Sequence, residues 1–504
     1  MAQVRYPSLY EISTRIWLTE RSRELGRGAT LGDVPDAALD RIAEQGFDWV
    51  WLLGVWQTGP AGRRVSLNHA AWRRDYLASL NDFTEDDVCG SPFAVQSYTV
   101  HADFGCGDSL LQFRERLRQR GIRLMLDFVA NHTALDHRWV SEWPQFYIQG
   151  EQQDLARDPH NYQLVTTTRG PRVLAHGRDP YFPAWPDTFQ LNYRHPVLRE
   201  AMIEELTRIA DLCDGVRCDM AMLLLPSVIA ATWGDRALPR DGQPPADAPF
   251  WPEAVTRVRR HHPDFLFMAE VYWDLEWALQ QQGFDYTYDK GLYDRLRAED
   301  ATAIRRHFAA TLDFQQKCVR FLENQDEHRA AAVFPPKVYP AAAVLTYLVP
   351  GLRFVQEGQL EGRRAKANLH LCRRPREPLY PEIEEFYKRF LPCLQRSEVR
   401  DGTWQLLECR PAWNGNRTWE RYVVFTWEER NGKRLLVAVN YGPMRGQCYV
   451  KLTWPELRGK QFLLRDLMAS AQYQRDGNGL AERGLYLDMP EWGYHIFEVT
   501  RPER

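Results

Sequence analysis

Four acidic residues stand at or just beyond the ends of short apolar runs in this sequence. Asp127, Asp219 and Glu270 each fall near the end of such a run, and Asp326 lies just beyond another. Any one of them could be an ordinary surface acid at the start of a loop, but burying a charge is costly, so four in the same position favour a shared cleft. Converging carboxylates suit the cleavage of glycosidic bonds, where one attacks and another keeps a proton at neutral pH.

These acids need a scaffold that gathers strand ends in one place. Over the first 400 residues, short apolar runs alternate with amphipathic helix patterns, which is typical of an α/β protein with a parallel sheet. The runs fall at residues 9–12, 47–53, 122–129, 213–220, 265–272, 318–322 and 352–355. About eight strand candidates favour a closed (β/α)8 TIM barrel, and such barrels carry their chemistry at the carboxyl ends of the strands.

Two regions interrupt this alternation and predict the domain organisation. Residues 133–192 are rich in Asp, Pro, Tyr and Trp without a clean period, and they are too long for a plain loop, so we expect a small inserted subdomain. From about residue 400, short β-like runs are separated by turn signals, which predicts an antiparallel β-sandwich domain over residues 396–504. The barrel is then expected from residues 1–132 and 193–395.

Composition excludes several classes of function. Hydrophobic residues make up 44% of the chain and charged residues 26%, as in ordinary globular proteins, and the net charge of −3 gives no general attraction to nucleic acid or an anionic membrane. No run of about 20 apolar residues predicts a membrane span. The first 20 residues lack the pattern of a signal peptide, so the expected compartment is the cytoplasm. Nine scattered cysteines without a C-x-x-C pair predict neither a disulfide framework nor a zinc site.

Four sequence motifs carry a resemblance to a known family. They are residues 127–132 (DFVANH), 215–219 (GVRCD), 269–271 (AEV) and 321–327 (FLENQDE). In this order and on these strands they resemble the motifs of the α-amylase family, glycoside hydrolase family 13. The resemblance extends from about residue 9 to 360, and a C-terminal β domain also fits it.

The resemblance implies a role for each of three acids. Asp219 would attack the anomeric carbon and form a covalent glycosyl-enzyme, and Glu270 would protonate the leaving group and then deprotonate the acceptor. Asp326 would bind sugar hydroxyls and favour the distorted, oxocarbenium-like transition state. Such a pair implies retention of the α configuration, with the carboxyls of Asp219 and Glu270 about 5–5.5 Å apart.

Five further residues are expected to bind substrate. Arg217 lies two residues before the nucleophile and so on the same side of its strand, where it can hold Asp219 ionised. By the resemblance, His132 donates to a sugar hydroxyl and Phe93 stacks beneath the sugar, although plain core packing explains Phe93 equally well. The remaining expected substrate-binding residues, each from one of the motifs, are Asp127 and Gln325.

Seven tryptophans in the intervening segments could stack on the faces of sugar rings, or could simply anchor loops and core. They are Trp56, Trp72, Trp139, Trp143, Trp185, Trp273 and Trp277.

The sequence departs from the family pattern at two places. Gln325 stands where the family has a histidine before the third acid; an amide can hydrogen-bond a hydroxyl but cannot carry positive charge. Residues 220–223 read Met-Ala-Met-Leu where many members have Lys-His. The usual calcium ligand set is therefore incomplete, although Asn131 is present, and we expect no metal or other cofactor. These departures also argue against an ordinary starch-degrading amylase.

Three functional hypotheses remain open. The leading one is a retaining α-glycoside hydrolase acting on α-glucosides or α-glucan oligosaccharides. The alternative is a transglycosidase or isomerase, trehalose-synthase-like or phosphorylase-like, in which a sugar or phosphate captures the intermediate. The third is a non-catalytic carbohydrate-binding protein, which the retention of all three acids disfavours. The only expected partner is the oligosaccharide or glucoside substrate; linkage, chain length, acceptor and oligomeric state stay open.

Overall fold

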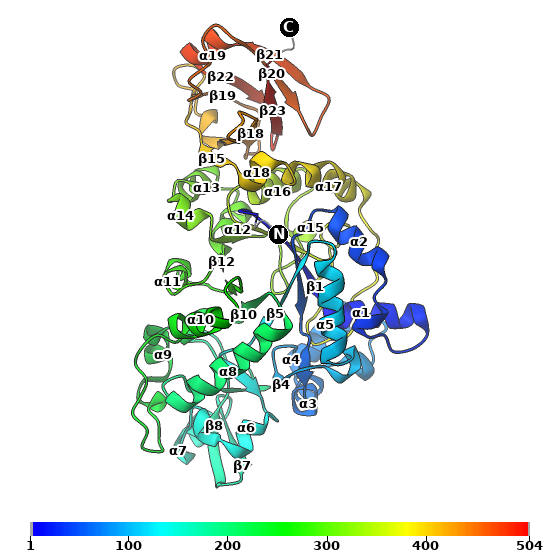
Figure 1. The fold of residues 1–504 in the computed structure, drawn as a ribbon, viewed down its shortest axis with the longest axis vertical. Helices are drawn as coiled ribbons and strands as arrows, with labels where there is room; N and C mark the ends of the chain where they lie inside the picture. Colours follow the sequence, from blue (N-terminus) through cyan, green and yellow to red (C-terminus); the bar gives the residue numbers. More distant parts are fainter. Residues whose placement is uncertain (1–3, 502–504) are drawn as a thin grey trace.

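The predicted barrel is present. The structure, a computed structural model, describes residues 4–501, and eight parallel strands close into a ring in the order β1-β14-β13-β12-β11-β10-β5-β2 (Figure 1). The strands are β1 (Ser8–Ser13), β2 (Trp49–Leu53), β5 (Arg123–Phe128), β10 (Gly215–Cys218), β11 (Leu266–Ala269), β12 (Tyr286–Tyr288), β13 (Cys318–Arg320) and β14 (Leu352–Gln356). The ring is closed by β1, where Tyr10 pairs with Val355 on one side and with Val50 on the other.

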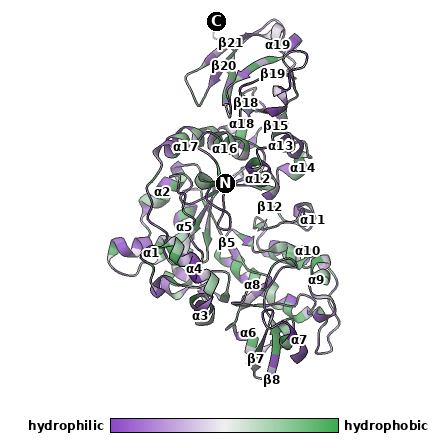
Figure 2. Ribbon diagram, turned by 180° about the vertical axis from the view of Figure 1, so that it is seen from behind, coloured by the Kyte–Doolittle hydropathy of each residue, from purple (hydrophilic) through white to green (hydrophobic). Residues whose placement is uncertain are grey.

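Helices cover the outside of this ring. Most of them bury one face, and in Figure 2 these carry both hydrophobic and hydrophilic residues; α16 is buried along nearly its whole length. They are α2 (Asp36–Glu44), α5 (Gly107–Arg118), α8 (Pro196–Leu212), α10 (Phe250–His261), α11 (Glu276–Gln281), α12 (Lys290–Arg297), α13 (Ala301–Phe308), α16 (Tyr339–Tyr347) and α17 (Pro381–Leu394). Within residues 4–501, none of the helices is both long and apolar enough to span a bilayer.

Residues 133–192 form a small unit beyond β5, at the bottom of Figure 1. Here β6 (His132–Ala134) pairs with β9 (Thr188–Gln190), and β7 (Tyr162–Thr167) pairs with β8 (Gly170–Ala175). Two short helices, α6 (Arg138–Glu142) and α7 (Gln152–Arg157), complete it. Its apolar residues, including Ile148 and Val173, cluster with Trp233 of α9 (Pro226–Trp233), so the unit packs on the segment that follows β10.

A second excursion, between β2 and α5, is a feature that the sequence pattern did not separate from the barrel. It contains an antiparallel pair, β3 (Trp56–Thr58) and β4 (Val95–Val100), with α3 (Pro60–Asn68) and α4 (Ala70–Ser79) between them. The helical patterns of α3 and α4 resemble those of barrel helices, so periodicity alone does not distinguish them. This excursion supplies one wall of the site described below.

The C-terminal segment forms the expected β-sandwich. One sheet has six strands in the order β15-β17-β18-β23-β20-β21, and the other has three in the order β16-β19-β22. Their bounds are β15 (Thr403–Leu406), β16 (Cys409–Pro411), β17 (Tyr422–Glu428), β18 (Arg434–Asn440), β19 (Gly446–Val450), β20 (Gln461–Asp466), β21 (Gln472–Asp476), β22 (Leu485–Met489) and β23 (Tyr494–Thr500). Val424 and Leu436 of the larger sheet cluster with Cys448 and Leu487 of the smaller one.

The opposite face of the larger sheet joins the core of the barrel. Phe425 and Val437 belong to the same hydrophobic cluster as the barrel strands. The indole Nε1–H of Trp427 donates to the carbonyl of Leu348, just after α16, over 2.7 Å. The barrel and the sandwich therefore share buried surface and are not simply tethered by a linker.

Candidate active site

The carboxyl ends of the barrel strands surround a cavity of about 280 Å³. Asp219 follows β10, Glu270 follows β11, and Asp326 comes after β13; all three line this cavity. The rest of the lining comes from Trp72, Ser91, Phe93, His132, Trp185, Asp187, Thr188, Met220, Tyr272 and His370. The structure thus brings together the three acids that the sequence singled out.

One buried cation, Arg217, contacts two of these acids. Arg217 of β10 is fully buried; its Nη1 donates to Asp219 Oδ1 over 2.6 Å, and its Nη2 lies 2.7 Å from Glu270 Oε2. The guanidinium is also packed among aromatic rings, with the centroid of Phe93 5.1 Å away and that of Trp51 5.3 Å away. Such cation–π packing holds the charge in place where water is excluded.

Glu270 receives two further hydrogen bonds. The backbone N–H of Met220 donates to Oε2 over 2.8 Å, and the hydroxyl of Tyr272 donates to Oε1 over 3.0 Å. Met220 has φ 43°, a left-handed conformation that is costly for a residue with a Cβ, and the N–H of the next residue, Ala221, donates to the backbone carbonyl of Glu270 over 3.0 Å. Burial raises the pKa of Glu270; Arg217 opposes that rise and Asp219 adds to it. Burial likewise raises the pKa of Asp219, against the same arginine.

Asp326 is held by its neighbour in sequence. The amide Nε2 of Gln325 donates to Asp326 Oδ2 over 2.7 Å, and the ammonium of Lys366 donates to the Asp326 backbone carbonyl. Burial raises the pKa of Asp326 to about 6, and the nearby Glu270 adds to the rise. Gln325 therefore orients Asp326 and is not itself part of the cavity lining.

Asp127 lies beneath the cavity and not in its lining. Its Oδ1 accepts from the indole of Trp51 over 3.1 Å, and its Oδ2 accepts from the backbone N–H of Gly54 over 2.7 Å. Burial raises its pKa to about 7, with Arg217 opposing. Because it is absent from the cavity lining, Asp127 braces the ends of β2 and β5 where the sequence predicted a contact with substrate.

His132 and Phe93 both face the cavity. Burial lowers the pKa of His132 to about 3, so its ring is neutral, and it lies 5.1 Å from that of Trp185. Phe93 packs on Arg217 and also lines the cavity, and its stacking beneath a sugar stays a prediction.

Asn131 is engaged within the protein. Gln190 Nε2 donates to its Oδ1 over 2.8 Å, and its own Nδ2 donates to Gln190 Oε1 over 3.1 Å. Across residues 4–501, His, Cys, Asp and Glu form no group of three or more arranged to hold a metal ion.

Sequence reasoning did not assign several lining residues to the cavity. Tyr272 lies two positions after Glu270, so strand alternation carries a signal for it. Trp72 appeared only as one of seven tryptophans that could line subsites. His370 and Asp187 belong to irregular segments with no period, and nothing in their local sequence points to the site.

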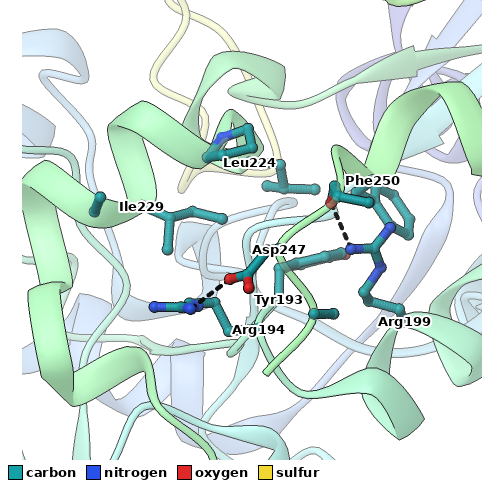
Figure 3. A pocket seen from close by; sticks show the side chains of 11 residues that line it. Tyr193, Arg194, Arg199, Leu224, Ile229, Asp247 and Phe250 are labelled. Atoms are coloured by element: carbon teal, nitrogen blue, oxygen red, sulfur yellow. Dashed lines mark hydrogen bonds and ion pairs between the residues drawn. The ribbon is translucent and has the colours of Figure 1, made fainter. Parts of the chain in front are cut away.

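A second cavity, of about 150 Å³, lies between α8, α9 and α10 (Figure 3). Its charged groups are already paired: Arg194 with Asp247, and Arg199 with Glu253 at 2.9 Å and with the carbonyl of Ala248 at 2.6 Å. Because its charged side chains are paired within the protein, we assign no ligand to this cavity.

Comparison with known proteins places the catalytic barrel in a family. A family model described as the alpha amylase catalytic domain matches residues 39–371. The chain belongs to the α-amylase family. Its strands β2 to β14, which carry all three acids, lie within the matched region.

Individual relatives are distant. Alpha-amylase MalA of Haloarcula japonica is 24% identical over 366 residues, covering 71% of this chain and 44% of that protein. Trehalose synthase/amylase TreS of Mycolicibacterium smegmatis is 30% identical over 135 residues, covering 24% of this chain and 22% of that protein. The alignments thus span less than half the length of both relatives.

Solved structures show the same fold. The maltogenic α-amylase AmyB of Thermotoga neapolitana superimposes with a TM-score of 0.67 at 16% identity, over 98% of this chain and 99% of that one. The α-amylase of Geobacillus thermoleovorans in complex with acarbose gives a TM-score of 0.66 at 16% identity, over 99% of both chains.

Proposed function

We propose that this protein is a retaining α-glycosidase that acts on α-glucosides or short α-glucan oligosaccharides. The observation that carries the proposal is the single guanidinium of Arg217 set against Asp219 and Glu270 at the edge of one cavity. A fixed positive charge favours the ionised form of a neighbouring carboxylate. The single positive charge of Arg217 cannot balance two buried negative charges, so one of the two carboxyl groups, of Asp219 or Glu270, retains a proton.

In the first step, a carboxylate oxygen of Asp219 forms a bond to the anomeric carbon while the bond from that carbon to the leaving oxygen breaks. Glu270 gives its proton to the leaving oxygen. In the second step, the ionised Glu270 takes a proton from water, whose oxygen displaces Asp219 from the anomeric carbon. Two inversions at one carbon give net retention.

The neighbouring side chains support these steps in the proposal. Asp326, oriented by Gln325, accepts hydrogen bonds from sugar hydroxyls and favours the positive charge that develops on the ring. The neutral His132 has one ring N–H to donate to a hydroxyl. We also propose that the enzyme needs no cofactor. We propose a cytoplasmic location because all nine cysteines are unpaired, as suits a reducing compartment.

One observation favours the second candidate function, transfer to a sugar acceptor. On the Glu270 side of the site, Tyr181 is 68% exposed and packs edge-on against Trp273, with ring centroids 4.8 Å apart. Exposed aromatic faces stack on sugars, so this pair could hold a second sugar ready to intercept the intermediate in place of water.

The test is a time-resolved proton NMR assay. The panel is maltose, trehalose, sucrose, maltotetraose, isomaltose and p-nitrophenyl α-glucoside, each with and without phosphate. Initial release of a free α-anomer supports hydrolysis with retention, whereas new glycosides or a sugar phosphate support transfer. Initial release of the β-anomer would overturn the retaining mechanism.

The acids are tested in the same assay. Asp219→Asn and Glu270→Gln should each lower turnover at least about a thousandfold while the circular dichroism spectrum stays unchanged, since each removes a group that acts at the reacting carbon. Asp264→Asn is the matched control, because Asp264 is exposed and precedes the same strand, β11, at its other end. Wild-type rates in either active-site variant would refute the assignment.

A further inference from the structure

We infer that the cavity accepts a single sugar unit on the side away from Glu270, so that the enzyme removes one unit at a time from the non-reducing end. This inference rests on the proposed glycosidase function and adds a substrate geometry to it. It depends on which side of the cavity is closed and on the contacts that hold the closing residues in place.

The barrel order gives the direction. Glu270 follows β11 and faces the leaving group, because it is the proposed proton donor. In the closed ring, β1 lies opposite β11, and β14 and β2 are the two neighbours of β1. The segments that follow β2 and β14 therefore face Glu270 across the cavity and meet the non-reducing side of a bound sugar.

Those two segments meet in an aromatic wall. Trp72 comes from α4, in the excursion after β2, and His370 comes from the segment after β14. Their ring centroids lie 4.4 Å apart, and the ring of His69 stacks on Trp72 at 4.2 Å. Trp72 and His370 line the same cavity of about 280 Å³ as the three acids, so the wall stands close to the reacting carbon.

Backbone pairing between residues 87–89 and 370–372, here called the strap, holds the wall in place. Val88 and Leu371 form an antiparallel bridge between the two segments. On either side of it, the N–H of Cys89 donates to the carbonyl of His370 and the N–H of Cys372 donates to that of Asp87, each over 2.8 Å. Main-chain bonds of this kind fix the position of the wall before any substrate arrives.

Side chains reinforce the strap. Nδ1 of His370 lies 2.8 Å from the hydroxyl of Ser66, and Arg373 pairs with both Asp82 and Asp87 at 2.8 Å. Burial lowers the pKa of His370 to about 4, so its ring is uncharged at neutral pH. The wall thus consists of two neutral rings held by backbone and side-chain contacts, and in this inference it bars a second sugar in that direction.

The opposite rim is built differently. Tyr181 and Phe182 are 68% and 66% exposed, and both backbone N–H groups are held by the carboxylate of Asp179. No strap comparable to Val88–Leu371 joins this rim to the far wall among the described residues. A longer substrate extends on this side, as its leaving group.

The test compares two p-nitrophenyl maltoheptaosides, one with a free non-reducing end and one whose non-reducing end carries a 4,6-O-ethylidene block. Chromatography separates the nitrophenyl products. The wild-type enzyme should release glucose and the nitrophenyl hexaoside first from the free substrate, and should act at least about a hundredfold more slowly on the blocked one. Internal cuts at similar rates on both would overturn the inference but leave the glycosidase function standing.

Variants of the wall sharpen the result. Trp72→Ala should raise the rate on the blocked substrate at least about tenfold, whereas Trp72→Phe keeps an aromatic ring in the wall and should not raise that rate. Trp413→Ala is the matched control, since Trp413 is 55% exposed on the C-terminal domain. The comparison of the two substrates needs only the wild-type protein and so holds even if a variant fails to fold. No turnover of any glycoside would overturn the proposed function itself.

Discussion

At the scale of single residues, the site contains one buried cation beside several buried acids. Arg217 contacts Asp219 and Glu270. Two further hydrogen bonds act on separate acids: the hydroxyl of Tyr272 donates to Glu270, and the amide of Gln325 donates to Asp326. Because these donors act on different acids, removing them one at a time should move different limbs of the pH profile.

The basic limb should respond to Tyr272. Its hydroxyl stabilises the ionised form of Glu270, so Tyr272→Phe raises the pKa of Glu270 further above its ordinary value. Since Glu270 must be protonated to act as the acid, activity falls as pH rises through that pKa, and the limb should move to higher pH. Profiles of kcat/KM against pH measure the shift. Tyr293→Phe removes a buried hydroxyl outside the cavity and should leave the limb in place; a shift to lower pH in Tyr272→Phe would contradict the role.

The acidic limb should respond to Gln325. Asp326, with a pKa of about 6, must be ionised, so activity rises as pH rises through that value. Gln325→Leu removes the N–H that favours the carboxylate, which raises the pKa of Asp326 and moves the acidic limb to higher pH. Gln325→His keeps a donor at this position and should therefore place the acidic limb at lower pH than Gln325→Leu does. Equal shifts in the two variants would show that the side chain acts through packing alone.

At the scale of elements, most strands and all four motifs were predictable from local pattern, and two features were not. Arg217 lies on β10 and Asp219 follows the strand directly, two residues on, so the alternation of side chains along an extended chain places them together. By contrast, β12 reads Tyr-Thr-Tyr between Asp285 and Asp289, so no apolar run marks it. The wall was also beyond prediction, because Ser66 and His370 are 304 residues apart and meet only through the closed barrel.

One element carries a buried charge with a purely structural task. Arg353 of β14 is fully buried, and its guanidinium donates to the carbonyls of Tyr347, Val399 and Tyr6. Arg353→Met leaves these acceptors without a donor and should lower the free energy of unfolding by roughly 3 kcal/mol, measured by urea titration. Arg157→Met, on the surface of α7, is the control and should change little. Equal unfolding energies for the two variants would contradict this role.

At the scale of the whole molecule, the barrel and the sandwich share one core. A chain ending at residue 395 would expose the face of the barrel that Phe425 and Trp427 cover, and would leave the Leu348 carbonyl without its indole partner. We expect this truncated protein to aggregate, as judged by size-exclusion chromatography, where the full chain elutes as a defined species. A monodisperse fragment with full activity would show that the shared core is dispensable.

The closure of the ring by β1 also has a consequence during synthesis. β1 leaves the ribosome long before β14, the strand that completes its pairing, because the two are separated by most of the barrel sequence. At roughly 5–20 residues per second, the open edge of β1 waits tens of seconds for its partner. The ring closes only when that late strand arrives, and His370 of the aromatic wall follows later still, so a nascent chain that stops before residue 352 has all three acids in an open barrel without its wall.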